Sequence, residues 1–145
     1  MNHIGPYEKL CGRQKHVDGS YDVSLEADGC AEGWEAGVLL RASSLSDGGE
    51  GEDKELGNNF FIGYRVSISE KSIKLWKHRY NEKLLAECEC MPGTKVQMNI
   101  EVVGNLIEVR KGKKVVLSYK DPEPIMCGYN GFHVRKCMLV EGEIC

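Results

Sequence analysis

The stretch KVQMNIEVVGNLIEVRKGKKVVLSYKD, residues 95–121, decides the fold class of this chain. In its first nine residues every second side chain is apolar: Val96, Met98, Ile100 and Val102. A period of two predicts a β-strand with one face on a core and the other toward solvent. Gly104 and Asn105 follow, and both tolerate the positive φ angles of a two-residue hairpin turn. The stretch therefore predicts three antiparallel strands, joined at GN and at KGKK.

The same alternation recurs along much of the chain. It appears in residues 20–27, 60–68 and 72–78, while the continuously apolar run 35–43 predicts a strand covered on both faces. After a loop punctuated by prolines, residues 131–144 add one or two closing strands. No segment carries the 3.6-residue apolar period of an amphipathic helix. Roughly eight or more short strands predict an all-β fold, either an antiparallel β-sandwich or a barrel.

Length and composition limit the function classes. The chain has 145 residues, of which 41% are hydrophobic and 28% are charged, and its net charge is −3. This length predicts one domain, residues 1–145, in which residues 1–19 form an edge strand or a linker. No basic stripe is present to neutralise phosphates, so we expect no nucleic-acid partner. No apolar run approaches the roughly 20 residues that span a bilayer, so we expect no membrane insertion.

The first residues and the cysteines bear on the cellular compartment. The opening MNHIGPYEKLCG lacks the basic and then apolar layout of a signal peptide. Seven cysteines are present, an odd number without regular spacing, which fits free thiols better than a disulfide framework. We therefore expect a reducing, cytoplasmic compartment rather than secretion.

One tryptophan stands on the polar side of its predicted strand. In the segment SIKLWKH, Ile73 and Leu75 share one face, and Lys74, Trp76 and His78 share the other. A strand with one buried face is expected to be polar on its opposite face. A large aromatic side chain there indicates either a platform for a ligand or a contact with another domain.

Several segments together carry a resemblance to a known family: DGSYDVSLEA, AGVLLRAS, NFFIGYRVSI, the 95–121 stretch and GYNGFHVRKCMLVEGEI. Residues 20–144 resemble concanavalin A-like, or laminin G-like, jelly-roll domains. The pattern is similar to that of levan-type carbohydrate-binding modules and of accessory sandwich domains of bacterial glycoside hydrolases. The resemblance implies a single antiparallel β-sandwich of the concanavalin A-like jelly-roll class.

The resemblance also implies a function and leaves an alternative open. It implies a non-catalytic carbohydrate-binding accessory module of a bacterial glycoside hydrolase. Its ligand would be an oligosaccharide or polysaccharide, and its partner a catalytic glycosidase domain. The family also contains domains that bind no sugar. The alternative is therefore a structural or oligomerisation β-sandwich that packs against a catalytic domain and has no ligand of its own.

Catalysis and metal binding are not expected of this chain by itself. Retaining glycosidases with concanavalin-like sheets resemble one another in an E-x-D-x-E strand, which ECEC and EGEI do not complete. Cys88 and Cys90 have no second pair at a zinc-binding spacing, so no cofactor is expected. The acidic loop 43–59 offers calcium the carboxylates of Asp47, Glu50 and Asp53, but it lacks a spaced D-x-D-x-D-G pattern. A solvated acidic loop is the favoured interpretation.

Candidate ligand-binding residues gather at predicted strand ends and in the loops beside them. Sugars are bound by aromatic faces, while carboxylates, amides and arginines bond to hydroxyl pairs. On this chemistry the predicted site comprises Trp34, Glu35, Arg41, Asn58, Trp76, His78, Arg79, Tyr80 and Tyr129. Two of these residues also have an interpretation without a ligand. Trp34 would cap the end of the sandwich, and Arg41 would pair with an acid of the 47–55 loop. Tyr64 is in register with apolar neighbours and is expected in the core.

Overall fold

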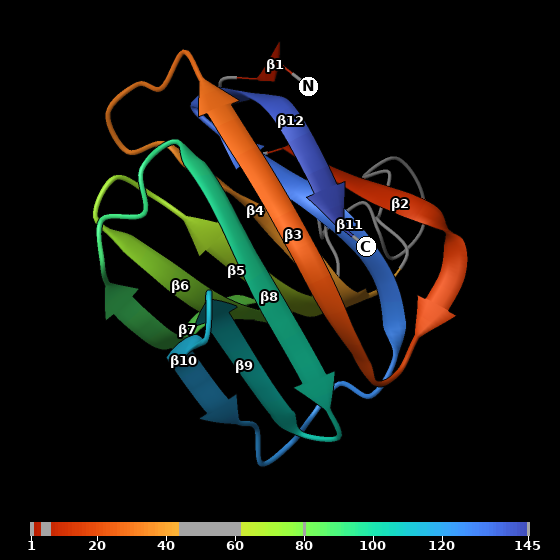
Figure 1. Ribbon diagram of the computed structural model, residues 1–145. Helices are drawn as coiled ribbons and strands as arrows, with labels where there is room; N and C mark the ends of the chain where they lie inside the picture. The colour runs from red at the N-terminus through yellow and green to blue at the C-terminus, as the bar shows by residue number, and fades with distance from the viewer. Residues whose placement is uncertain (1, 4–6, 44–61, 80, 145) are drawn as a thin grey trace.

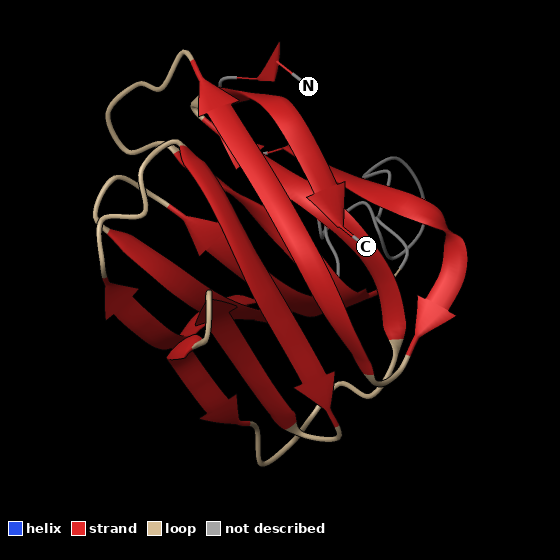
Figure 2. Cartoon of the chain, viewed as in Figure 1, coloured by secondary structure: helices blue, strands red, loops and turns tan. Residues whose placement is uncertain are grey.

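The structure, a computed structural model, describes residues 2–3, 7–43, 62–79 and 81–144. Within these ranges the chain forms strands joined by turns and loops, and no helix is present (Figure 2). The described part accordingly contains no helix long and apolar enough to span a membrane. The strands are β1 Asn2–His3, β2 Tyr7–His16, β3 Gly19–Asp28, β4 Glu35–Ala42, β5 Gly63–Ile68, β6 Ser72–Arg79, β7 Asn81–Glu89, β8 Lys95–Val103, β9 Leu106–Lys111, β10 Lys114–Lys120, β11 Gly128–Arg135 and β12 Cys137–Ile144.

The strands form two antiparallel sheets that lie face to face (Figure 1). Sheet 1 has the order β1-β12-β3-β8-β9-β10, and sheet 2 has the order β2-β11-β4-β5-β6-β7. Successive hairpins build β5–β6–β7 and β8–β9–β10, while the pairs β3–β12 and β4–β11 join segments far apart in the sequence. β2 lies at the edge of sheet 2 and pairs with β11. The two layers confirm the predicted antiparallel β-sandwich.

The core lies between the sheets and follows the predicted alternation. Its buried side chains include Tyr21, Val23 and Leu25 of β3, Tyr64, Val66 and Ile68 of β5, Ile73 and Leu75 of β6, and Val96, Met98, Ile100 and Val102 of β8. Burial of each such aliphatic side chain stabilises the fold by about 1.5–3 kcal/mol. The position of Tyr64 in the core is the one that its register predicted.

The two central strands of sheet 2 are buried on both faces. Every residue of β4 and of β5 is buried. For β4 this confirms the prediction from the continuously apolar run 35–43. In β5, however, the residues that alternate with the core are Arg65 and Ser67. The face of sheet 2 that points away from sheet 1, called here the outer face, therefore keeps polar groups out of water.

Two tight turns fix the strand registers. The β8–β9 hairpin turns at Gly104, whose φ of 58° is a left-handed conformation that glycine adopts without strain. The β5–β6 hairpin turns within two residues, because the Ser69 amide donates to the Ser72 carbonyl at 3.0 Å. This turn sets the register that places Arg65 directly opposite Trp76.

A buried hydrogen-bond network closes one end of the sandwich. Tyr64 Oη donates to Asp121 Oδ2 at 2.6 Å and accepts from the Ile125 amide at 3.0 Å. The Lys77 ammonium forms an ion pair with the same carboxylate at 2.6 Å. Burial favours the neutral form of Asp121, but the hydrogen bonds from Lys77 and Tyr64 outweigh it and hold the pKa of this carboxyl below its usual range. Burial and the bond to Asp121 raise the pKa of Tyr64.

Candidate functional site

The outer face of sheet 2 gathers polar side chains from neighbouring strands. Strand alternation sends Ser67 and Arg65 of β5 to this face, since their neighbours in the strand fill the core. In the β5–β6 register, Ser67 lies opposite Lys74 and Arg65 lies opposite Trp76. Directly opposed residues of adjacent strands are close enough for their side chains to contact. Arg65 therefore lies on a central strand, with β4 on one side and β6 on the other.

Arg65 is the centre of a buried charge cluster. Its side chain is only 2% exposed, and Nη1 donates to Glu82 Oε1 at 2.8 Å. Nη2 lies 3.2 Å from Glu35 Oε1. The guanidinium carbon lies 5.0 Å from the centroid of the Trp76 ring, within cation–π distance. One arginine thus joins carboxylates of β4 and β7 to an indole of β6.

His78 adds an uncharged imidazole to the same face. Its Nε2 lies 3.7 Å from Glu82 Oε1. Burial and the nearby charge of Arg65 lower the pKa of His78 from 6.5 to about 4, so the ring is neutral at pH 7. Burial alone would raise the pKa of Glu82, but the charge of Arg65 and its hydrogen bond hold that pKa below the usual range. Glu82 is therefore ionised and accepts hydrogen bonds.

Several polar atoms of this face are removed from water without a hydrogen bond. Among the residues that the structure describes, no hydrogen-bond partner is present for Trp76 Nε1, Arg65 Nε or Ser67 Oγ. Glu35 Oε1 has its ion pair with Arg65 but no hydrogen bond of good geometry within the same residues. A buried polar group left unsatisfied costs about 1–3 kcal/mol, so such atoms are few in folded proteins. Several such atoms on one face mark a polar cluster whose hydrogen bonds the described residues do not complete.

A hollow of about 460 Å³ adjoins the cluster. Its walls include Trp34, Glu35, Lys74, Trp76, Glu87 and Arg135. Pockets for small ligands commonly enclose about 300–1,000 Å³ and combine aromatic walls with a few convergent polar groups. The hollow has this size and composition, and it is bordered by both tryptophans of the chain.

The structure brings together only part of the predicted site. Trp76, His78 and Glu35 share the outer face with Arg65. Trp34 is 7% exposed and belongs to the core cluster, and it also borders the hollow.

Arg41 and Tyr129 lie together elsewhere. Both border a separate hollow, and Lys15 Nζ lies 5.8 Å from the centroid of the Tyr129 ring.

The side chain of Arg41 is taken up by the fold itself. A left-handed φ of 50° interrupts the alternation of β4 at this residue. Its guanidinium donates to the carbonyls of Val17, Gly104 and Ile125 at 2.6–3.0 Å. It also pairs with Asp18 at 3.2 Å, while the acids of the 43–59 loop, the expected partners, lie outside the described residues. Arg41 therefore ties the loops at one end of the sandwich together, and we leave it out of the proposed ligand site.

Other predicted residues are separated from the cluster or lie outside the described residues. Arg79 alternates with His78 along β6 and borders a different hollow. Two ligand candidates and the three calcium candidates fall outside the residues that the structure describes: Asn58, Tyr80, Asp47, Glu50 and Asp53. Across the described ranges, no group of three or more metal-ligating side chains is placed to hold an ion.

Sequence reasoning did not select Arg65, Glu82, Ser67 or His133 for the site. His133 is 1% exposed and lies opposite Gly37 in the β4–β11 register. The position of Arg65 could have been predicted from the sequence, because a two-residue turn at Glu70 and Lys71 places it opposite Trp76. Glu82 pairs with His78 beside the turn between β6 and β7, a turn that the sequence analysis did not locate. His133 comes from β11, a strand distant in sequence from β5.

Comparison with known proteins adds evidence on the fold. No protein-family model and no curated protein sequence matches this chain. The carbohydrate-binding module CBM66 from Bacillus subtilis aligns with 98% of this chain and 83% of its own, at a TM-score of 0.74 and 14% identity.

Two further solved structures agree. A Bacillus subtilis protein of unknown function with a galectin-like fold aligns over 99% of this chain and 80% of its own, at a TM-score of 0.67 and 13% identity. Sheep galectin-11, in a complex with glycerol, aligns over 99% of both chains, at a TM-score of 0.54 and 13% identity. With its two antiparallel sheets and these structural neighbours, the chain has the galectin-like, concanavalin A-like β-sandwich fold that its sequence resembles.

Proposed function

We propose that the outer face of sheet 2 binds a carbohydrate and that the chain is a non-catalytic carbohydrate-binding module. The observation that carries the proposal is the Glu35–Arg65–Glu82 cluster packed against Trp76. Buried donors and acceptors of this cluster have no hydrogen-bond partner among the described residues.

The chemistry of the cluster suits sugar hydroxyl groups. Around the hollow, the carboxylates of Glu35 and Glu87 accept hydrogen bonds and the side chains of Lys74 and Arg135 donate them, so adjacent hydroxyls of one sugar ring meet both kinds of group. The indole offers an apolar surface to the C–H face of a pyranose or furanose ring. Arg65 also holds its two carboxylate partners in place, so little side-chain entropy remains to be lost on binding.

The same cluster favours binding over hydrolysis. Glycosidases need one carboxyl group that stays protonated near neutral pH to protonate the leaving group. Here the charge of Arg65 keeps the pKa of Glu82 below its usual range. His78, with its pKa lowered to about 4, is a neutral imidazole at pH 7 and is not a general acid there either.

An accessory role in a bacterial glycoside hydrolase is the finer part of the proposal. The likeness in fold to the CBM66 module supports it. A catalytic glycosidase domain is the partner in this proposal, and a polysaccharide or its oligosaccharides are the ligand.

Isothermal titration calorimetry with soluble fructans, xylans, arabinans and β-glucans tests the proposal. We expect one class of glycan to bind, and Trp76→Ala to weaken that binding by at least about tenfold. Because Trp76 lies outside the core, this variant is expected to lose only about 1 kcal/mol of unfolding free energy. Incubation with the same glycans is expected to release no reducing sugar.

Arg110 supplies a matched control. It pairs with Glu101 and Glu108 on sheet 1, as Arg65 pairs with two carboxylates on sheet 2. Arg65→Met is expected to abolish glycan binding, and Arg110→Met to leave it unchanged. If no glycan binds, or if both variants weaken binding equally, the site is not the outer face of sheet 2.

A further inference from the structure

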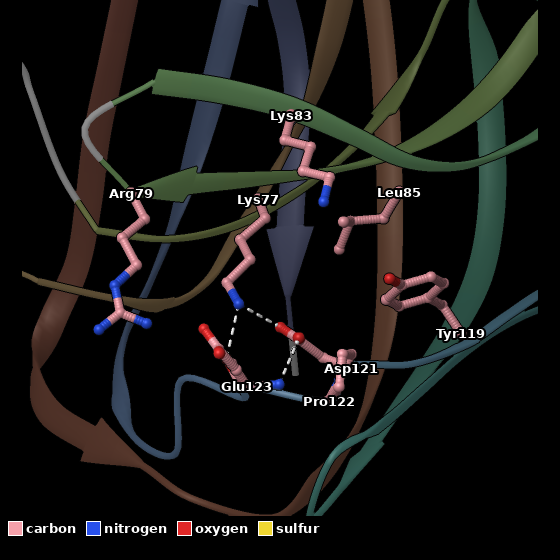
Figure 3. A pocket seen from close by; sticks show the side chains of 8 residues that line it. All are labelled: Lys77, Arg79, Lys83, Leu85, Tyr119, Asp121, Pro122 and Glu123. Carbon is pink, nitrogen blue, oxygen red and sulfur yellow. Dashed lines mark hydrogen bonds and ion pairs between the residues drawn. The ribbon is translucent and has the colours of Figure 1, made fainter.

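Another hollow, of about 500 Å³, is bordered by side chains of the β6–β7 hairpin (Figure 3). Its walls are Lys77, Arg79, Lys83, Leu85, Tyr119, Asp121, Pro122 and Glu123. Lys77 and Arg79 alternate along β6 with Trp76 and His78, which places the two sites on opposite faces of one strand. The hollow lies where the edge strand β7 of sheet 2 approaches the edge strand β10 of sheet 1.

The charges around this hollow are not balanced. Lys77 and Lys83 are directly opposite each other in the β6–β7 register, and like charges so placed destabilise a sheet. The Lys77 ammonium is compensated, since it pairs with Asp121 at 2.6 Å and donates to the Glu123 carbonyl at 2.6 Å. For Lys83 and Arg79, no carboxylate of the described residues lies within ion-pair distance. Within the described ranges, these two cations have no ion-pair partner, and besides Asp121 the carboxylate that borders the hollow is that of Glu123.

The rest of the wall is apolar or able to donate a hydrogen bond. Figure 3 shows Lys83, Leu85 and Tyr119 on one side of Lys77, with Arg79 on the other side. The Tyr119 hydroxyl is the neutral donor of this group, and Leu85 and Pro122 offer carbon surface. The Lys77–Asp121 ion pair borders the same hollow, and Asp121 also accepts a hydrogen bond from the Tyr64 hydroxyl.

We propose that this hollow binds the anionic group of a small organic molecule, independently of the sugar site. Lys83 is the main charged contact, and the Tyr119 hydroxyl donates to the same group. Leu85 and Pro122 contact the carbon skeleton, and Arg79 adds attraction from the other side of Lys77. A carboxylate, a phosphate ester and a sulfate ester share this chemistry, and the experiment distinguishes them.

The test is an NMR titration of ¹⁵N-labelled protein with glucuronate, glucose 6-phosphate and glucose 6-sulfate, with glucose as the neutral control. We expect at least one of the three anions to shift the amide signals of Lys77, Lys83 and Tyr119. Glucose is expected to leave these signals unchanged, whatever it does on the outer face of sheet 2. Lys83→Gln is expected to reduce the affinity for the anion by at least about tenfold, and Arg79→Gln is expected to reduce it by less.

Lys113→Gln is the charge-matched control, because Lys113 lies in the exposed β9–β10 turn, away from the hollow. It is expected to leave the affinity unchanged. The proposal is overturned if no anion shifts these signals, or if Lys113→Gln and Lys83→Gln weaken binding equally, which would mark non-specific attraction to lysines. Because glycan binding is followed through the outer-face signals in the same spectra, failure of one site is distinguishable from failure of the other.

Discussion

The guanidinium carbon of Arg65 lies 5.0 Å from the centroid of the Trp76 ring, on the side of sheet 2 that faces away from the core. The tryptophan on the polar side of its strand therefore has an internal partner, and the pair forms one unit with Glu35 and Glu82. An arginine buried by a tryptophan and two carboxylates is a costly arrangement unless its remaining polar atoms are satisfied. Glu35 and Trp76 of this unit border the hollow in which we place the ligand.

Replacing Arg65 by lysine separates charge from geometry. A lysine keeps the positive charge but cannot bond to two carboxylates through a planar fork, nor stack flat on the indole. We expect Arg65→Lys to weaken glycan binding by about tenfold, and to cost about 1–2 kcal/mol of unfolding free energy. Calorimetric titration and urea unfolding measure the two effects. Glycan affinity equal to that of the wild type would show that charge alone suffices.

The lowered pKa of His78 makes stability depend on pH in a defined window. Its pKa falls from 6.5 to about 4 in the folded state, so between these values only the unfolded chain takes up the proton. The free energy of unfolding is therefore highest above pH 6.5. It decreases by on the order of 2 kcal/mol as the pH falls toward 4. Urea unfolding at pH 7 and pH 4.5 measures the loss. His78→Gln is expected to reduce it, and an unchanged loss would assign it to other groups.

The network that closes the sandwich end is expected to be cooperative. Tyr64→Phe removes the hydroxyl that donates to Asp121 and accepts from the Ile125 amide, at an expected cost of about 1–3 kcal/mol. Asp121→Asn is expected to destabilise by a similar amount. Because the two residues share a bond, the double variant should lose less than the sum of the single losses. Strict additivity in urea unfolding would contradict the network.

Arg41 is expected to act on stability and not on ligand binding. Arg41→Met leaves three backbone carbonyls without their donor and is expected to destabilise the fold by about 3 kcal/mol. Differential scanning calorimetry measures the loss. At a temperature where the variant is folded, its glycan affinity should equal that of the wild type. A selective loss of affinity would return Arg41 to the ligand site.

Period-two patterns were sufficient to predict the sandwich and much of its core. The alternation around Val66 and Ile100 gave the correct inward faces, because a strand buried on one side leaves a regular apolar pattern. The burial of β4 on both faces also followed from its continuous apolar run. Trp76 was singled out correctly as an outward residue, because the strand period was read from its neighbours.

The site itself was only partly predictable, for two physical reasons. A positive φ at Arg41 breaks the alternation of β4, and a single-residue irregularity leaves no mark in an apolar pattern. The partners of Arg65 come from β4 and β7, and side-chain reach across a sheet depends on curvature and bulges rather than on spacing. The sequence analysis grouped Arg79 with His78 because the two are adjacent in sequence. Strand alternation instead places Arg79 with Lys77 at the hollow of about 500 Å³.

The central claim is that the outer face of sheet 2 binds a sugar. It is tested most directly by titrating ¹⁵N-labelled protein with the glycan panel and mapping the amide signals that move. The account predicts that saturating amounts of one glycan shift signals of Glu35, Arg65, Ser67, Trp76 and His78, and that the same glycan leaves the spectrum of Arg65→Met unchanged. Shifts confined to other parts of the fold, or no shift with any glycan, would contradict it.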